Sequence, residues 1–281
     1  QIPYFAQKLR QQKLIDHCIR GEAETTVMNI ITGDLPCPGV DTETYASASN
    51  VNDHVYMDFT DTDPKDYISG YSNGVLPIES SRGCVRRCVF CDIPTVHMGY
   101  RSKKGDRLAN ELIDYYEKYN VTNYFFHDAL CNGNMKDFRL FNQCLIDYYQ
   151  SNTFPEKTLR YSSHAIVRSE QQMQEQDYEL MSRAGAETMV IGVESGSETV
   201  RNTMRKNFDN QALDYSMQMY RKYNIQVYLL LIVGFPNEFE SEFQETLDML
   251  TRYQKYVADG TIIGVNLGTT LTVEEGAPIY N

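Results

Sequence analysis

Three cysteines lie within eight residues of one another, immediately after a short apolar run. They are Cys84, Cys88 and Cys91, and the run is Val75-Leu76-Pro77-Ile78. A loop that follows a strand can direct successive thiolates into one small volume, and Gly83 permits the tight bend that this requires. Three ligands leave a fourth coordination position open, which is typical of reactive metal sites rather than closed structural ones. The spacing therefore predicts a metal ion or cluster with an open position.

The same cysteines could instead belong to a zinc site. His97 lies six residues after Cys91 and could complete a set of three Cys and one His. The usual second half of such a site, a closely spaced pair of further Cys or His residues, is missing from the neighbouring sequence. A non-catalytic module that binds zinc or an iron–sulfur cluster is therefore the alternative to an enzyme.

The motif Cys84-x3-Cys88-x2-Cys91, with Phe90 before the last cysteine, resembles the signature of the radical S-adenosylmethionine (radical SAM) superfamily. The resemblance implies that the three thiolates bind three irons of a 4Fe-4S cluster and that SAM chelates the fourth. It also implies reductive cleavage of SAM to a 5'-deoxyadenosyl radical, with an electron donor such as flavodoxin or ferredoxin as a partner.

The charge of the chain argues against a nucleic-acid partner. Its 281 residues include 26 basic and 38 acidic ones, a net charge of −12. A surface this negative repels phosphate backbones, so we expect no bulk nucleic acid, and we expect the basic cluster Arg101-Ser-Lys-Lys104 to be a solvated loop. The sequence has no apolar run near the ~20 residues of a membrane span and no signal peptide at its start, so we expect no membrane association.

The cysteine count indicates a reducing compartment. Seven cysteines at irregular spacing do not suit a disulfide framework, and we expect a cytoplasmic protein. Cys18, Cys37 and Cys144 are expected to be small buried side chains. Cys131 is a weaker candidate for a site because it follows a predicted strand.

From residue 75 onwards, apolar β-prone runs alternate with helical patterns. The predicted strands are 76–80, 123–128, 158–166, 187–194, 226–234 and 261–271. The predicted helices are 106–119, 136–150, 169–183, 208–223 and 238–257. Such β-α repeats predict a parallel sheet, and the ~205 residues available suit about six units where a full eight-unit barrel takes ~250. We therefore predict an α/β fold, a partial (β/α)6 TIM-like barrel, with sites at the carboxyl ends of its strands.

The remaining sequence divides into three predicted parts. Residues 75–281 form the barrel, and residues 33–74, rich in turn formers, read as a linker over its surface. Residues 1–32 have helical patterns and the turn Gly21-Glu22-Ala23-Glu24, which resembles the end of a cobalamin-binding Rossmann-like domain. The chain begins Gln-Ile-Pro without an initiator Met, so we expect part of a longer protein.

Three further segments resemble the cobalamin-associated subgroup of the superfamily. Phe126-His-Asp128 follows the second strand, and the resemblance makes Asp128 the partner of the SAM amino group; a turn-capping Asp is the alternative. Ile191-Gly-Val-Glu194-Ser195-Gly-Ser implies SAM contacts at Glu194 and Ser195, with Arg205 or Lys206 approaching the SAM carboxylate. Gly234-Phe-Pro236 implies an adenine pocket, although Asn237 stands where relatives usually have Gly.

The reaction is constrained only by resemblance, and methyl transfer to an unidentified small molecule or peptide is the direction it implies. A methylthiotransferase-like enzyme is the less favoured alternative, because its cysteine-bearing N-terminal domain and nucleic-acid-binding tail do not fit Cys18, Cys37 and the negative charge. The cobalt-binding D-x-H-x-x-G segment is absent, so we expect cobalamin only in a longer protein and not in this chain. No catalytic acid or base is identified, and His127 and His164, near strand ends, are the two worth testing.

Overall fold

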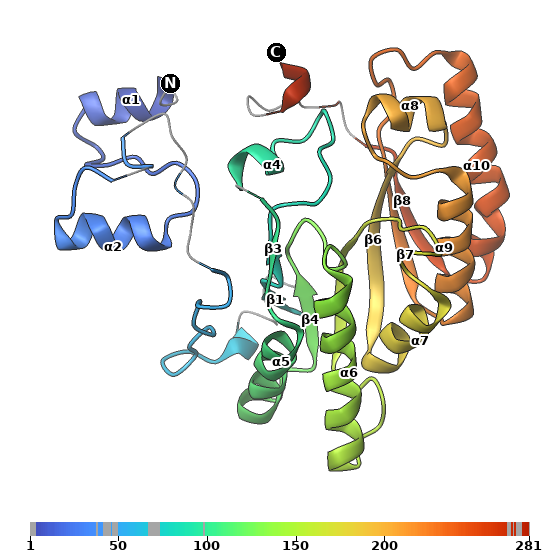
Figure 1. Cartoon of the computed structure of the whole chain (residues 1–281), viewed down its shortest axis with the longest axis horizontal. Helices are drawn as coiled ribbons and strands as arrows, with labels where there is room; N and C mark the ends of the chain where they lie inside the picture. The colour runs from blue at the N-terminus through green and yellow to red at the C-terminus, as the bar shows by residue number, and fades with distance from the viewer. Residues whose placement is uncertain are drawn as a thin grey trace.

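The computed structural model contains one six-stranded parallel sheet flanked by helices (Figure 1). The structure describes residues 4–37, 39–41, 46, 50–66, 74–97, 99–268, 271, 273 and 277–280. The strands lie in chain order, β1-β4-β5-β6-β7-β8, as expected when each strand is followed by a helix that returns to the same sheet. The predicted partial TIM-like barrel is therefore confirmed.

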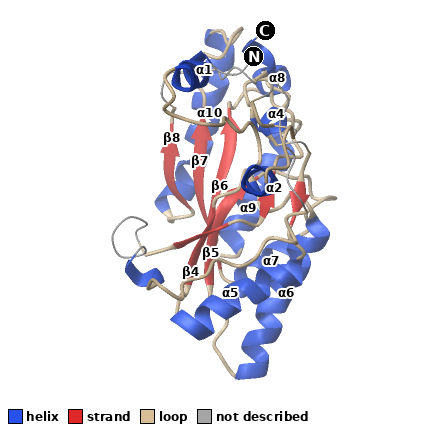
Figure 2. Cartoon of the chain, turned by 90° about the vertical axis from the view of Figure 1, so that its left-hand side faces the viewer, coloured by secondary structure: helices blue, strands red, loops and turns tan. Residues whose placement is uncertain are grey.

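Each predicted strand segment contains an observed strand or nearly all of one. The strands are β1 (Leu76–Ile78), β4 (Asn123–Phe126), β5 (Arg160–Ala165), β6 (Ala186–Glu194), β7 (Gln226–Leu231) and β8 (Ile262–Asn266). Figure 2 shows that the carboxyl ends of the longer strands point towards the end of the molecule where α4 and α8 lie. Loops from neighbouring strands therefore meet at one edge of the sheet.

The two faces of the sheet have different environments. In β7, Val227, Leu229 and Leu231 are buried, whereas Tyr228 and Leu230 between them are half-buried. The strand is apolar almost throughout, yet only one of its faces is fully buried, because the inner face of the incomplete barrel opens onto a cavity that Leu230 lines. Alternation of this kind gives each strand one face for the core and one for the site.

Helices cover the outer face of the sheet. They are α5 (Gly105–Tyr119), α6 (Met135–Asn152), α7 (Glu175–Ala184), α9 (Asn210–Lys222) and α10 (Glu240–Ala258). Each contributes apolar side chains to a single core, among them Leu112, Leu145, Met181, Met217 and Met249. Within the described ranges, no helix combines the length and apolar character that crossing a membrane would require.

Several short elements were not predicted. They are the pair β2 (Ser81–Arg82) and β3 (Arg101–Ser102), α4 (Ile93–Val96), α8 (Glu198–Thr203) and the 3-10 helix η1 (Pro278–Tyr280). Elements of two to six residues are too short to display a periodic pattern. Two of them, β2 and β3, turn out to frame the cysteines.

The segments that precede the sheet are α1 (Tyr4–Gln11), α2 (Glu24–Thr32) and extended chain. Residues 50–66 run across α5, where the Met57 backbone N–H donates to the Tyr115 hydroxyl at 2.7 Å. Phe59 also packs edge-on against Tyr115, with ring centroids 5.7 Å apart. The N-terminal third of the chain thus contacts the barrel through specific side chains.

Candidate functional site

The cysteines sit on a closed loop, residues 83–100, which we call the cysteine loop. Its ends are joined by the antiparallel pair β2–β3, in which Ser81 opposes Ser102 and Arg82 opposes Arg101. Gly83 has φ +77°, and a Cβ there would lie 2.3 Å from the Gly99 carbonyl oxygen. Only glycine permits this close approach, so the residue that the sequence suggested for a tight bend is required where the loop closes.

The cysteine loop lies over a cavity of about 340 Å³ at the carboxyl ends of the strands. All three cysteines line it, together with residues that come from strand ends far apart in the sequence. The other lining residues are Arg86, Phe90, Ile93, His127, Asp128, Ala129, His164, Ala165, Ile166, Val190, Gly192, Glu194, Lys206 and Leu230. The fold therefore brings the cysteines into one space with Phe90, Asp128, Glu194 and Lys206.

The thiols of the cysteine loop are partly screened from water. Burial raises the pKa of Cys88 and of Cys91, and the nearby Lys206 ammonium opposes the shift at Cys88. Cys84 Sγ accepts a hydrogen bond from the backbone N–H of Arg86 at 3.3 Å. Since thiolates rather than thiols coordinate metals, binding of an iron centre would release these protons.

The donor set, three thiols on one loop, is of the kind that holds an iron–sulfur cluster. Among the residues that the structure describes, no three Cys, His, Asp or Glu side chains converge on a point suited to one metal ion. A four-iron cluster presents its coordination positions at separate corners, so its thiolate ligands stand apart. His97, considered above as a fourth zinc ligand, instead contacts Glu22, with 2.9 Å between Nδ1 and Oε1.

Glu194 and Lys206 form an ion pair on the cavity wall, with 2.8 Å between Oε1 and Nζ. Glu194 ends β6 in the left-handed region, at φ +67°, which is uncommon for a residue with a side chain. Gly192 makes room for the pair, because a Cβ there would lie 2.4 Å from Glu194 Oε1 and 3.0 Å from Lys206 Nζ. Lys206 Nζ also lies 5.9 Å from the ring centroid of Phe90. These contacts place both charges beside the cysteine loop.

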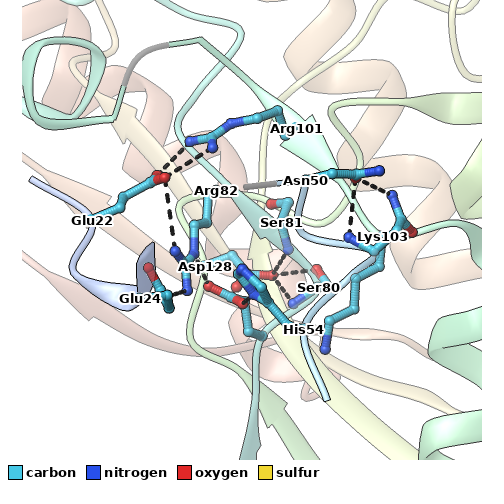
Figure 3. Close-up of polar contacts among 12 residues, drawn as sticks. Glu22, Glu24, Asn50, His54, Ser80, Ser81, Arg82, Arg101, Lys103 and Asp128 are labelled. Carbon is cyan, nitrogen blue, oxygen red and sulfur yellow. Dashed lines mark hydrogen bonds and ion pairs between the residues drawn. The ribbon is translucent and has the colours of Figure 1, made fainter. Parts of the chain in front are cut away.

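Asp128 lies at the other side of the cavity, after β4, and is almost fully buried. Its Oδ2 accepts from the backbone N–H groups of Ser80 and Ser81 at 2.7 and 2.8 Å and from the Ser80 hydroxyl (Figure 3). Burial raises its pKa to about 7, although these hydrogen bonds favour the carboxylate. Asp128 therefore anchors the chain that enters the cysteine loop, and it also lines the cavity.

Two histidines lie on neighbouring strands of the sheet, His127 directly after β4 and His164 within β5. His127 and His164 both pack edge-on against Phe125, with centroid distances of 4.9 and 5.7 Å. His164 Nδ1 is buried and has no hydrogen-bond partner in the described part of the chain, and burial lowers the pKa of this ring. The free nitrogen of a neutral imidazole can donate a hydrogen bond to a ligand or accept one from it, depending on the tautomer.

Four of the residues proposed by resemblance lie outside the cavity lining, namely Ser195, Arg205, Gly234 and Pro236. Ser195 is fully buried and accepts at its carbonyl oxygen from Arg201 Nη1 at 2.6 Å. Pro236 is exposed, and the Gly234 backbone N–H donates to Glu238 Oε2 at 2.6 Å. Phe235, which lies between Gly234 and Pro236, still reaches the cysteine loop, because its ring centroid is 6.4 Å from that of Phe90.

Sequence reasoning did not single out Arg86 and Gly192, and it misjudged the basic cluster after the cysteines. Arg86 lies between Cys84 and Cys88 in the sequence, and this position could have identified it as a residue of the site. The cluster was expected to be solvated, but Lys103 is buried and its Nζ lies 2.6 Å from Glu111 Oε2, while Arg101 pairs with Glu22. Glu22 is 79 residues from Arg101, and Glu111 lies on the helix that follows Lys103, so the composition of the cluster alone could not reveal these pairs.

Cys131 belongs to a different environment from the three loop cysteines. It is buried in the core, and burial raises its pKa to about 12. It lines a separate small cavity with Phe126 and Phe138. The Cys131 thiol is therefore a packing side chain of the core and not a member of the site that the three loop cysteines line.

The sequence matches the family model of the radical SAM superfamily over residues 78–250. Among curated proteins, the chain is 23% identical over 274 residues to tRNA-2-methylthio-N(6)-dimethylallyladenosine synthase of Flavobacterium psychrophilum, covering 88% of this chain and 52% of that protein. It is 24% identical over 288 residues to an uncharacterised methyltransferase of Pyrococcus horikoshii, covering 94% and 58%. The chain thus spans about half the length of the curated relatives it matches.

Solved structures with the same fold include two described as radical SAM enzymes that involve cobalamin. The methyltransferase TsrM from Kitasatospora setae, solved with tryptophan and a SAM analogue, superposes with a TM-score of 0.75 at 15% identity, covering 96% of this chain and 54% of TsrM. A further TsrM structure holds cobalamin and a [4Fe-4S] cluster. The cobalamin-dependent enzyme OxsB gives a TM-score of 0.70 at 18% identity, covering 100% of this chain and 41% of OxsB. At these identities the likeness establishes the fold.

Proposed function

The chain belongs to the radical SAM superfamily, and from that premise we propose that it holds a 4Fe-4S cluster on Cys84, Cys88 and Cys91 and binds SAM beside it. One observation carries the proposal: the three cysteines of a closed loop line the same cavity as the Glu194–Lys206 ion pair. A bound cluster supplies an electron to SAM, which is how enzymes of this superfamily start radical reactions.

The charged residues of the cavity suit the amino-acid end of SAM. Lys206 Nζ can pair with a carboxylate, and Glu194 can accept from an ammonium group, so the two charges match the two charged groups of that end. Asp128 is a second acceptor for the ammonium group, on the opposite wall. Phe90, next to the last cysteine, adds an aromatic ring to the same cavity wall.

The inner face beyond these charges offers a place for the substrate. His127, His164 and the apolar residues Val190 and Leu230 line it. The neutral ring of His164, with its unused Nδ1, would orient an uncharged substrate group by one hydrogen bond. We propose a small molecule or a peptide as the substrate, and a flavodoxin or ferredoxin as the electron donor.

Methyl transfer is the reaction that we propose, supported by the fold shared with TsrM and by the likeness to the Pyrococcus horikoshii protein. Methylthio transfer is the second candidate, supported by the likeness to the Flavobacterium psychrophilum synthase and to MtaB of Bacillus subtilis, 26% identical over 185 residues. We propose that this chain alone does not hold cobalamin. Stoichiometric cobalamin in the anaerobically purified chain would contradict that part of the proposal.

The test is anaerobic reconstitution of the chain with iron and sulfide, followed by reduction with dithionite in the presence of SAM. We expect a brown protein with the electron paramagnetic resonance (EPR) signal of a reduced 4Fe-4S cluster, and cleavage of SAM. Release of S-adenosylhomocysteine would support methyl transfer, whereas 5'-deoxyadenosine alone would point to hydrogen abstraction or rearrangement. A colourless protein that retains one zinc and leaves SAM intact would overturn the proposal.

A further inference from the structure

The turn Gly21-Glu22-Ala23-Glu24 lies against the base of the cysteine loop. Glu22 comes from the N-terminal segment, yet its side chain is 2% exposed because residues flanking the cysteines surround it. Figure 3 shows Glu22 between Arg82 and Arg101, with Glu24 beside Arg82. These two arginines belong to β2 and β3, the strands that close the loop.

The strand register creates an electrostatic problem at this position. Arg82 and Arg101 are direct cross-strand partners, and like charges opposite one another destabilise a strand pair. Glu22 Oε2 lies 2.9 Å from Arg101 Nη1 and 3.8 Å from Arg82 Nη1, and Glu22 Oε1 contacts Arg101 Nη2. One carboxylate therefore neutralises both sides of the closure.

The two arginines depend on Glu22 to different degrees. Arg82 has two further carboxylate partners, Glu24 at 2.5 Å and Glu79. For Arg101, Glu22 is the one carboxylate within reach among the residues that the structure describes. Loss of Glu22 would therefore leave Arg101 of β3 without a carboxylate partner among the described residues, whereas Arg82 of β2 would keep two.

Glu22 also contacts the loop itself and is held firmly in place. Its Oε1 lies 2.9 Å from Nδ1 of His97, which follows α4 inside the cysteine loop. Its own backbone N–H donates to the Ala46 carbonyl at 3.1 Å. Gly21, at φ +91°, allows this approach, since a Cβ there would lie 2.4 Å from the Ala46 oxygen. The turn thus presents its carboxylate from a fixed backbone.

We infer that Glu22 is a positioning residue that clamps the cysteine loop shut from the N-terminal segment, so that the three cysteines keep one spacing. The inference rests on the proposed function for its consequence, which is retention of the cluster. The clamp itself does not require a cluster, because every contact that forms it is made by residues of the chain.

The decisive variant is Glu22→Gln, which keeps the size of the side chain and removes its charge. Glu24→Gln is the matched control, because Glu24 lies two residues away, is 43% exposed and contacts Arg82 alone of the two arginines. The first measurement is hydrogen exchange of peptides from the cysteine loop in the cluster-free chain. We expect exchange to be roughly tenfold or more faster in Glu22→Gln, and close to wild type in Glu24→Gln.

The second measurement is the rate at which a chelator removes iron from the reconstituted proteins, read with the EPR signal of the cluster. We expect faster iron loss and an altered EPR signal in Glu22→Gln only. Equal exchange in Glu22→Gln and wild type would overturn the clamp, whatever the cluster does. A wild-type chain that binds no cluster would overturn the proposed function, while the exchange comparison would still decide the clamp.

Arg101→Gln tests the same contact from the other side and carries the test if Glu22→Gln fails to fold. It should speed exchange in the same peptides. Where both single variants fold, the double variant should add little to either, because residues that share one interaction are not additive. Full additivity of the two changes in exchange would show that Glu22 and Arg101 act separately and would contradict the inference.

Discussion

Glu194 combines a strained backbone with a proposed role in binding SAM, so replacing it should separate stability from affinity. Its φ of +67° lies in the left-handed region, which glycine adopts freely and alanine does not. Both Glu194→Gly and Glu194→Ala remove the carboxylate and leave Lys206 without it. The difference between the two variants therefore reports the backbone strain less the ordinary cost of glycine relative to alanine.

The expected magnitudes follow from this geometry. A left-handed conformation costs a residue with a Cβ about 1–2 kcal/mol, whereas glycine at an ordinary position is worse than alanine by about 0.5–1 kcal/mol. We therefore expect Glu194→Gly to be as stable as Glu194→Ala or up to ~1.5 kcal/mol more stable. For SAM, loss of a hydrogen bond to a charged group costs about 1.5–3 kcal/mol, or roughly tenfold to a hundredfold in affinity, in both variants.

Stability is measured by urea unfolding of the cluster-free chains, and affinity by anaerobic titration of SAM into fully reconstituted proteins. Unchanged SAM affinity in both variants would refute the assignment of Glu194. If Glu194→Ala were the more stable variant by about 0.5–1 kcal/mol, the difference between alanine and glycine at an ordinary position, the reasoning about strain would be wrong.

Three further predictions concern the cluster, the buried acid and the buried arginine. Cys88→Ala should fail to retain iron after reconstitution, because two thiolates cannot hold the cluster, whereas Cys144→Ala should match wild type; equal iron in both would contradict the ligand assignment. Burial raises the pKa of Asp128 to about 7, against an ordinary value of 3.8, so the native chain keeps a proton that the unfolded chain has released. Wild-type stability in urea should therefore fall between about pH 4 and pH 7 relative to Asp128→Asn, and parallel pH profiles would refute this. Arg201→Met should lower the free energy of unfolding by about 1.5–3 kcal/mol, because it removes the bond to the Ser195 carbonyl, and a smaller loss would mean that this buried arginine is dispensable.

The sequence by itself determined the parts of this protein that depend on local spacing. The interval between Cys84, Cys88 and Cys91 indicated a site with an open position, and its resemblance to the radical SAM signature agrees with the family match. The alternation of apolar runs with helical patterns predicted the six strands and their parallel order. Both signals arise within one element and its neighbours, where periodicity and turn residues are set by the chain itself.

Tertiary structure decided which distant charges meet. Glu22 and Arg101 are 79 residues apart, and their pairing turned a stretch expected to be solvated into the base of the cysteine loop. The inner faces of the strands contribute Val190, Gly192 and Leu230 to the wall of a cavity, because the barrel is incomplete. The cavity includes Lys206 but not Ser195, since Glu194, the last residue of β6, lines the cavity while the next residue is buried and bonded to Arg201. Such pairings depend on where separate elements end in space, which no local pattern records.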